Sequence, residues 1–352
     1  MKRVAYLAEL GKQMANDEAL NQLAEAAEQY NPWFTKQFVQ YALEGICSNM
    51  LDENKLNSFA KQYSITDEQV QKTLGLIFAG NIPLVGFHDF LCGYLAGWKM
   101  QIKLSSKDDF LFKRVLELLQ QIDTEANQRI TLTEKLQNFD AVVATGSDST
   151  YSYFEYYFRN YPRILRKNRN SVAILTGQET PEQLKQLADD VFLYFGLGCR
   201  NVSKLYVPVG YDITQLFPHF ETYKWLHSHT KFMNNYDYQR TILLLNKTPH
   251  FANEFVMLVE NENIASPIGT LYYEHWHDER VLQTKLGALA DKIQCVVAAQ
   301  GYLATHNSLL TTASSSSLAP LPSPFVSFGH AQQPSLIDYA DGIDTMQFLL
   351  GQ

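Results

Sequence analysis

Phe195-Gly-Leu-Gly-Cys199-Arg200-Asn201 is the stretch that decides the fold, because a helical pattern ends on its glycines and a strand pattern follows it. Upstream, Thr180, Pro181 and Gln183 form a capping box with proline at the first helical position. Apolar residues then recur at helical spacing as far as Phe195. Downstream, residues 204–208 are typical of a short strand. Cys199 is therefore predicted to lie on a tight turn between a helix and a strand.

This turn favours a reactive cysteine. Gly198 leaves room for a ligand to approach the backbone. Arg200 and Lys204 are close in sequence, and a positive neighbourhood stabilises a thiolate. A cysteine is by default a small buried hydrophobic residue, but the glycines and the two cations favour a nucleophile at position 199.

Composition sets the class of protein. The chain has 352 residues, of which 46% are hydrophobic and 19% charged, as in a globular protein of two or three structural domains. The net charge of −8 predicts no nucleic-acid partner. No signal-peptide core opens the chain, and the most apolar window, residues 82–98, is too short and polar for an integral membrane segment. Four widely spaced cysteines without a C-x-x-C pair indicate reduced thiols, so we expect a cytoplasmic protein.

The first half of the chain predicts helices followed by alternating strands and helices. Helical patterns cover residues 4–30, 33–50, 56–63 and 88–98, and a second capping box at Thr66 predicts a helix from there to about residue 78. Further on, the pattern predicts a strand from residue 100 into a polar turn, a helix over 109–122, a strand over 141–145 and a helix over 151–158. The alternation predicts an α/β fold with a parallel sheet of the dinucleotide-binding kind.

The loop Gly146-Ser147 follows the predicted strand 141–145 and precedes a helix. Such a strand–turn–helix layout presents backbone N–H groups to phosphate. An ordinary βα turn has the same appearance, and the three-glycine dinucleotide fingerprint is absent.

The second half predicts strands near residues 241–246, 255–259, 269–276 and 293–299, with helices near 212–219 and 278–289. The low-complexity run 311–324 is expected to be an exposed connector. The histidine pairs at 227/229 and 275/277 lack a ligand set at a recognisable spacing, so no metal site is predicted. The basic cluster at residues 159–169 is either a solvated turn or a docking site for phosphates of an anionic cofactor or substrate.

Together these residues carry a resemblance to a known family. Gly80-Asn81-Ile-Pro-Leu, Ile102-Lys103-Leu-Ser105-Ser106, Thr145-Gly146-Ser147 and Gly198-Cys199 resemble the asparagine turn, ribose-binding strand, cofactor turn and nucleophile of the aldehyde dehydrogenase superfamily. Within that superfamily, the stretches 103–108, 198–203 and 338–345 look most like the LuxC-type fatty acyl-CoA reductases. The resemblance covers residues 75–350 and is looser over the helical N-terminus.

The resemblance implies an aldehyde dehydrogenase-like α/β fold with a helical N-terminal region, a Rossmann-like cofactor domain and an α/β catalytic domain. It places the helical region and NADP-binding domain at residues 1–170 and the catalytic domain at 171–325. Residues 326–352 would return to the cofactor domain, and the cleft between the domains would hold Asn81, Cys199 and the nicotinamide.

The implied reaction is NADPH-dependent reduction of a long-chain fatty acyl-CoA to its aldehyde through an acyl-cysteine. Cys199 would be the nucleophile, and the Asn81 amide with the Cys199 backbone N–H would hold the oxyanion. The cofactor-binding residues would be Lys103, Ser105, Ser106, Gly146 and Ser147. Ser106 falls where NAD-preferring relatives often place a glutamate, so its neutrality beside lysines favours NADPH.

One departure from the superfamily bears on the reaction. Hydrolytic aldehyde dehydrogenases carry a glutamate base in a motif that corresponds to Leu165-Arg-Lys-Asn-Arg169, which has no carboxylate. Without that base, water has no obvious activator there, and discharge of the acyl-enzyme by hydride or a thiol is favoured. A base from elsewhere in the fold stays open as an alternative.

Three other functions are compatible with the sequence. The chain could be a short-chain CoA-acylating aldehyde dehydrogenase, an acyl-transfer or acyl-carrying subunit without redox activity, or an inactive scaffold. The resemblance further implies a homo-oligomer and, for this subfamily, a possible acyl-activating partner enzyme.

Overall fold

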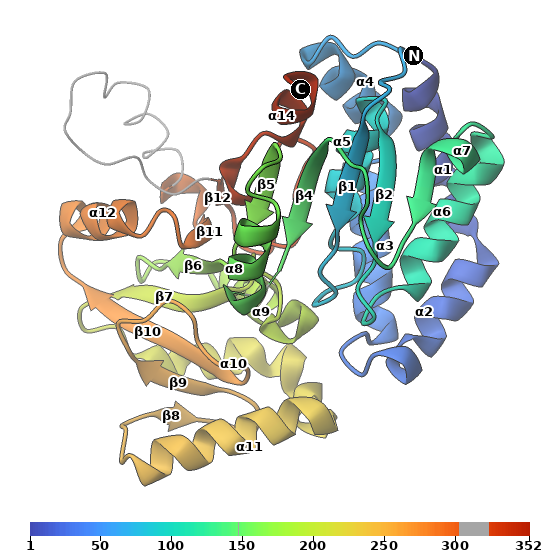
Figure 1. The fold of residues 1–352 in the computed structure, drawn as a ribbon. Coiled ribbons are helices and arrows are strands. Elements are labelled where there is room, and N and C mark those ends of the chain that lie inside the picture. Colours follow the sequence, from blue (N-terminus) through green and yellow to red (C-terminus); the bar gives the residue numbers. More distant parts are fainter. Residues whose placement is uncertain (147, 303–323) are drawn as a thin grey trace. The chain divides into compact units, whose positions relative to one another are not determined.

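The computed structural model describes residues 1–146, 148–302 and 324–352. The chain divides into two compact units. Unit 1 comprises Met1–Asn168 together with Gln333–Gln352, and unit 2 comprises Arg169–Gln332. Each unit has its own sheet, fully parallel in unit 1 and mostly parallel in unit 2 (Figure 1).

Unit 1 begins with four helices, α1(Lys2–Asn16), α2(Glu18–Tyr30), α3(Lys36–Asn49) and α4(Glu53–Gln62). Where one helix was expected over residues 4–30 there are two, separated at Asp17. The Asp17 carboxylate accepts from the Leu20 backbone N–H at 2.6 Å and so caps α2. It also pairs with Arg114 at 2.6 Å. The helical N-terminal region is thereby confirmed.

The sheet of unit 1 has five parallel strands in the order β3-β2-β1-β4-β5. The strands are β1(Thr73–Ile77), β2(Lys99–Lys103), β3(Ile130–Leu132), β4(Ala141–Thr145) and β5(Arg163–Arg166). The intervening helices are α5(Phe87–Leu95), α6(Phe110–Ile122), α7(Ala126–Arg129) and α8(Asp148–Tyr157). This doubly wound order confirms the predicted dinucleotide-binding type of sheet.

The helix expected from Thr66 to residue 78 is wrong, because residues 73–77 form β1, the central strand. The Thr66 hydroxyl accepts from Glu68 N, two residues on, so no capping box forms. Leu74 and Leu76 are fully buried. A Cβ on Gly75 would lie 2.7 Å from the end of the Leu136 side chain, so a larger residue there would require Leu136 to move. Burial of this short apolar run between two strands outweighs the local helix signal.

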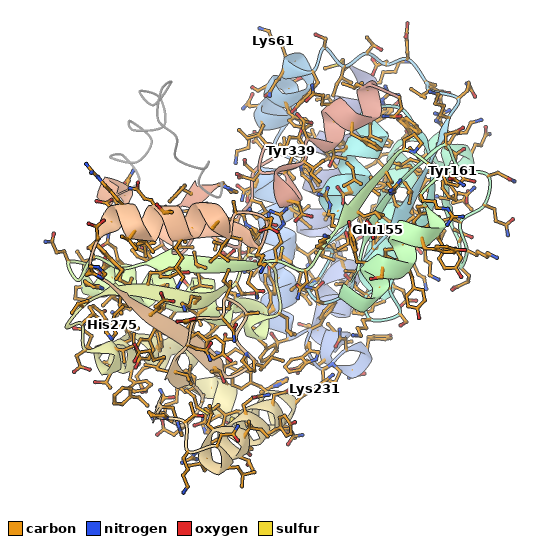
Figure 2. The ribbon with its side chains drawn as sticks, turned by 60° about the vertical axis from the view of Figure 1, so that its left-hand side comes forward. Lys61, Glu155, Tyr161, Lys231, His275 and Tyr339 are labelled. Carbon is orange, nitrogen blue, oxygen red and sulfur yellow. The ribbon has the colours of Figure 1, made fainter. Side chains whose placement is uncertain are left out.

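The last part of the chain, residues 333–352, packs into unit 1. α14(Thr345–Leu350) lies against α5, with Met346 and Leu349 in the core shared with the N-terminal helices. Tyr339 (Figure 2) and Tyr63 share a hydrogen bond of 2.8 Å, and the Tyr63 hydroxyl donates to Asp344 at 2.6 Å. Polar bonds and core packing both anchor this segment.

Unit 2 has a seven-stranded sheet in the order β12-β11-β6-β7-β10-β9-β8, parallel except for β8. Its strands are β6(Asn170–Ile174), β7(Val202–Pro208), β8(Phe251–Ala252), β9(Met257–Glu260), β10(Thr270–Trp276), β11(Ile293–Ala298) and β12(Phe325–Val326). Its α-helices are α9(Pro181–Phe192), α10(Phe217–Phe220), α11(Thr230–Leu245) and α12(Glu279–Ala288). The mixed α/β class and the predicted strands at 255–259, 269–276 and 293–299 are confirmed.

The strand expected at residues 241–246 is wrong, because this run is the last turn of α11. Short apolar runs do not distinguish a strand from a helix by periodicity alone. Here Leu244 and Leu245 are 60% and 73% exposed, so they are not a buried strand. Residues 311–323 of the expected connector lie outside the described residues.

Candidate functional site

The carboxyl edge of the unit 1 sheet carries the residues expected to meet the cofactor and the oxyanion. Asn81 follows β1, Lys103 ends β2 and Gly146 follows β4. These three strands are parallel neighbours, so their carboxyl ends share one edge. The strand order reverses between β1 and β4, and ligands of doubly wound sheets bind at such a switch point.

The turn that carries Asn81 is packed against the loop after β2. A Cβ on Gly80 would lie 2.5 Å from the Ser105 hydroxyl and 3.0 Å from Lys107, so only glycine fits. Asn81 itself is exposed. Leu84, three residues on, has a left-handed backbone (φ 54°). This part of the chain is thus held by close contact and not by regular structure.

The loop after β2 is polar and carries two lysines. Lys103, Ser106 and Lys107 are exposed, whereas Ser105 is half-buried. The Ser105 hydroxyl accepts from Lys107 N at 3.2 Å. The loop therefore exposes two cationic side chains and Ser106 to solvent. Its first carboxylate is Asp108.

The turn after β4 also requires glycine. A Cβ on Gly146 would lie 2.9 Å from Phe154 and 3.0 Å from Thr150, both on α8. Gly146 therefore packs directly against α8. Ser147 lies outside the described residues.

Cys199 lies in unit 2, on the turn between α9 and β7, as the sequence predicts. The capping box at Thr180 is formed on both sides, with Pro181 at the start of α9. After α9 the chain makes a 3-10 turn in which Tyr194, Phe195 and Gly196 are left-handed in succession (φ 53°, 58° and 74°). Two bulky residues in this conformation store backbone strain that the surroundings must offset.

Packing around Phe195 supplies part of that compensation. The side chain is 1% exposed, and its ring lies 4.3 Å from the His229 ring and 5.9 Å from that of Phe232 between centroids. Residues 194–196 are thereby fixed, and they set the direction in which the chain enters the Cys199 turn.

Hydrogen bonds of the Asn201 side chain also compensate for the backbone strain at residues 194–196. Its side-chain amide donates to the carbonyls of Asp190, Val191 and Leu193 at 3.1, 3.3 and 2.8 Å. These carbonyls lie at the end of α9 and just after it. The Asn201 side-chain oxygen accepts from Gly198 N at 2.8 Å. One buried residue therefore joins the end of the helix to the residue before Cys199.

Further contacts hold the Cys199 turn. The Ser171 hydroxyl donates to the Cys199 carbonyl at 3.0 Å, and Arg200 Nε donates to the Ala331 carbonyl. The Asp190 carboxylate accepts from the Gly329 and Ala331 amides at 2.7 and 2.9 Å. Burial raises the pKa of Asp190 to about 7, even though these amides lower it. Cys199 remains half-buried, so its turn is rigid while its side chain is not sealed in the core.

The cations near Cys199 in sequence have other partners. Lys204 is completely buried, pairs with Glu274 at 2.9 Å and donates to the Asn261 carbonyl. Arg200 is also buried and donates to Ala331. The sequence argument that both charges serve the thiol therefore does not extend to Lys204.

Burial disfavours a thiolate at two of the other cysteines. Burial raises the pKa of Cys47 to about 11 and that of Cys92 well above its usual range. Cys295 is fully buried, with its sulfur 3.0 Å from the Ser171 hydroxyl.

The basic cluster at residues 159–169 is mostly structural. Arg166 is buried, pairs with Asp89 at 2.5 Å and donates to the Ala340 carbonyl at 2.6 Å. Arg163 donates to the Arg159 carbonyl, and Lys167 lies over the Tyr151 ring. Most of these charges are thus committed to contacts within their own unit.

Across residues 1–146, 148–302 and 324–352, no group of three or more His, Cys, Asp or Glu side chains could hold a metal ion. In the same residues, no helix has both the length and the apolar character to cross a membrane.

The sequence alone does not identify three residues that support these turns: Ser171, Asn201 and Asp108. Asn201 stands two positions after Cys199, but nothing in a single sequence separates a buried cap from an exposed asparagine. Asp108 belongs to the quoted motif 103–108, yet its burial depends on how two loops pack.

Comparisons with known proteins agree with this architecture. The family model for acyl-CoA reductase (LuxC) matches residues 2–215, which includes the helical N-terminus. No curated protein matches the chain significantly. Solved structures of aldehyde dehydrogenases are similar to this chain at 10–13% identity, which shows the fold.

Three of these structures illustrate the likeness. Aldehyde dehydrogenase 21 from Physcomitrella patens, in complex with the product succinate, has a TM-score of 0.70 at 10% identity, covering 99% of this chain and 83% of its own. An NADP-dependent enzyme from E. coli has a TM-score of 0.68 at 11% identity, covering 93% and 77%. A Mycobacterium tuberculosis aldehyde dehydrogenase complexed with NAD+ has a TM-score of 0.64 at 12% identity, covering 88% and 75%.

The resemblance inferred from the sequence and the aldehyde dehydrogenase-like fold are thereby confirmed. Family and fold together support an oxidoreductase that acts between acyl-CoA and aldehyde. Because the family model matches more than half of its residues, the chain belongs to the LuxC acyl-CoA reductase family.

Proposed function

We propose that the chain reduces a long-chain fatty acyl-CoA to the fatty aldehyde with NADPH, through a covalent acyl-Cys199 intermediate. The observation that carries the proposal is the half-buried Cys199 on a strained turn that Asn201 and Ser171 hold rigid. Such preorganisation fits a nucleophile better than a packing residue. The aldehyde dehydrogenase-like fold supports the same role.

In the first step, the Cys199 thiolate attacks the thioester carbonyl carbon. The tetrahedral intermediate then breaks its bond to the CoA sulfur, which leaves as a thiolate. Asn81 and the Cys199 backbone N–H would donate to the oxyanion, and the loss of one such donor costs about 10²–10³ in rate. In the second step, the acyl-cysteine accepts a hydride and a proton, and the aldehyde leaves as the Cys199 thiol is restored.

The cofactor would bind at the carboxyl edge of the unit 1 sheet. The residues present fit a dinucleotide, because β1, β2 and β4 end at one edge of the sheet, at the point where the strand order reverses, and α8 starts there after β4. Lys103 and Ser105 would meet the ribose, Gly146 and Ser147 the diphosphate, and the cofactor supplies the hydride when bound. The exposed Ser106 between two exposed lysines favours a 2′-phosphate, which supports NADPH over NADH.

Hydrolysis of the acyl-enzyme is disfavoured in this proposal. The stretch 165–169 has no carboxylate, and Arg166 within it is bound to Asp89. Without a base at that position, hydride or thiol discharge is the expected fate of the acyl group.

The test is a spectrophotometric assay with acyl-CoA of graded chain length and NADPH, coupled to detection of released CoA. We expect aldehyde formation with equal consumption of NADPH and release of CoA. Absence of turnover at every chain length would refute the proposal.

Two variants of the assay separate the alternatives. A short-chain CoA-acylating dehydrogenase would prefer short acyl groups and the reverse reaction. An acyl-carrying subunit would label Cys199 with acyl groups but would show no NADPH binding in a fluorescence titration. Analytical ultracentrifugation, alone and with an acyl-activating enzyme added, tests the expected homo-oligomer and partner.

A further inference from the structure

Asp108 is a buried carboxylate that the proposed mechanism does not use. It is 5% exposed, and its Oδ2 accepts from the Leu84 backbone N–H at 2.6 Å. Its Oδ1 has no hydrogen-bond partner in the described part of the chain. A buried carboxylate with one unsatisfied oxygen is costly, so its presence calls for a structural or functional reason.

The bond joins two loops that have separate tasks in the proposed function. Asp108 ends the loop after β2, and its backbone N–H donates to the Ser105 carbonyl at 3.0 Å. Leu84 belongs to the turn that carries Asn81. The same loops also meet where Gly80 packs on Ser105.

The backbone conformation of Leu84 has to be stabilised by contacts with other residues. Its left-handed backbone (φ 54°) is unfavourable for a leucine, and its carbonyl accepts from Phe87 N at 2.9 Å at the start of α5. If Leu84 relaxed to a common conformation, the turn before it would change direction and Asn81 would move. The hydrogen bond that Leu84 N–H donates to the Asp108 carboxylate opposes that relaxation.

We propose that Asp108 is a positioning residue that latches the Asn81 turn to the loop expected to bind the cofactor ribose. The role of this latch in catalysis rests on the proposed function. The hydrogen bond that holds the two loops together does not depend on it. It fixes the Asn81 amide before substrate arrives, which is the preorganisation that an oxyanion donor requires.

Protonation modulates this latch. Burial raises the pKa of Asp108 to about 7, with the Leu84 bond lowering it and the neighbouring Asp109 raising it further. Once the latch opens, water restores the ordinary, lower pKa. Rising pH therefore favours the open state, because the open state releases the proton more readily.

Three variants test the latch. Asp108→Ala removes the acceptor, whereas Asp108→Asn keeps an oxygen for Leu84 and cannot ionise. Asp52→Ala is the matched control, because the Asp52 carboxylate also accepts one backbone N–H in unit 1, from Lys55 at 3.0 Å, at the start of α4.

The first readout is hydrogen–deuterium exchange of the peptide covering residues 78–87, corrected for the intrinsic rate. Exchange should be at least tenfold faster in Asp108→Ala and unchanged in Asp108→Asn and Asp52→Ala. From pH 6 to pH 8, corrected exchange should rise in the wild type and stay flat in Asp108→Asn. Equal exchange in Asp108→Ala and wild type would overturn the latch. If Asp108→Ala does not fold, the pH dependence of exchange in the wild type and in Asp108→Asn tests the latch instead. Exchange that does not change with pH in either protein would overturn the latch.

The second readout is the single-turnover rate of CoA release from acyl-CoA. A displacement of an oxyanion donor by about 1 Å costs on the order of 10²-fold, so Asp108→Ala should slow acylation 10- to 100-fold, with rescue by Asp108→Asn. Normal acylation with fast exchange would show that the latch does not serve Asn81, which overturns its catalytic role. If the wild type releases no CoA, the proposed function fails while the exchange data still judge the latch.

Discussion

Asn201→Ala removes the hydrogen bonds of a buried side-chain amide from the turn that carries Cys199. The two N–H groups of the amide are shared among three carbonyls at the end of α9, and the amide oxygen accepts from Gly198 N–H. Asn201 is 1% exposed, so water does not readily replace them. At about 1 kcal/mol for each lost bond, with a further penalty for the buried amide of Gly198, we expect a loss of about 3–5 kcal/mol in the free energy of unfolding.

The assay is thermal unfolding of the full chain, with the transition of unit 2 followed by a reporter in that unit. For a unit of this size, 1 kcal/mol corresponds to about 2–4 °C in Tm, so the transition should fall by about 6–20 °C. Alkylation of Cys199 provides a local readout, because release of the strained residues 194–196 should alter its rate.

The control is Asn235→Ala on α11. Asn235 makes one hydrogen bond, to the Lys231 carbonyl at 2.8 Å, on the helix surface. Its loss should change stability by about 0.5 kcal/mol or less. If Asn201→Ala unfolds at the same temperature as this control, the hydrogen bonds of Asn201 do not hold the turn and the reasoning is refuted.

Three further predictions concern chemistry, pH and a buried ion pair. Cys199→Ala should abolish acyl-enzyme labelling seen by mass spectrometry, whereas alanine at each of the other cysteines (Cys47, Cys92 and Cys295) should leave it intact; labelling elsewhere would contradict the assignment. The pKa of Asp190 is raised to about 7 in the folded chain from an ordinary value near 4, so the folded state keeps a proton that the unfolded state releases. The contribution of this group to the free energy of unfolding is fully present below about pH 4 and is lost as the pH rises through 7. Urea unfolding should therefore give a lower free energy of unfolding at pH 8 than at pH 5. Arg166→Met should cost about 3–5 kcal/mol, because it strands the buried Asp89 carboxylate. The double variant with Asp89→Leu should recover most of that stability in the same unfolding experiment; no recovery would mean that the other bonds of Arg166 dominate.

The sequence was informative where local chemistry and burial agree. The capping box at Thr180, the helix that follows it and the strand after Cys199 are predicted from residues within one short window, and all three are present. The helix ends at Phe192, three residues before the predicted end at Phe195, because the chain turns left-handed at Tyr194. The strand 141–145 is apolar and bounded by turn residues, and its limits were predicted to the residue. The family resemblance added the roles expected of Asn81 and Cys199, which stay predictions.

The misses have a common physical cause, which is tertiary contact between distant residues. The capping pattern at Thr66 predicts a helix, but residues 73–77 form a strand because they are buried between two neighbouring strands. The exposed end of α11 looked like a strand because its apolar residues are contiguous. The left-handed Leu84 and Tyr194 gave no sign in the sequence, since leucine and tyrosine adopt this backbone only where neighbours compensate for it.

The division of the chain has a consequence for its synthesis. Unit 2 is contiguous, whereas unit 1 takes its final helix from residues 333–352. Met346 and Leu349 are buried against helices whose sequence left the ribosome much earlier. During translation, those helices must therefore keep an apolar surface uncovered until the whole of unit 2 has emerged, and this nascent intermediate is the state in which a chaperone would find most to bind.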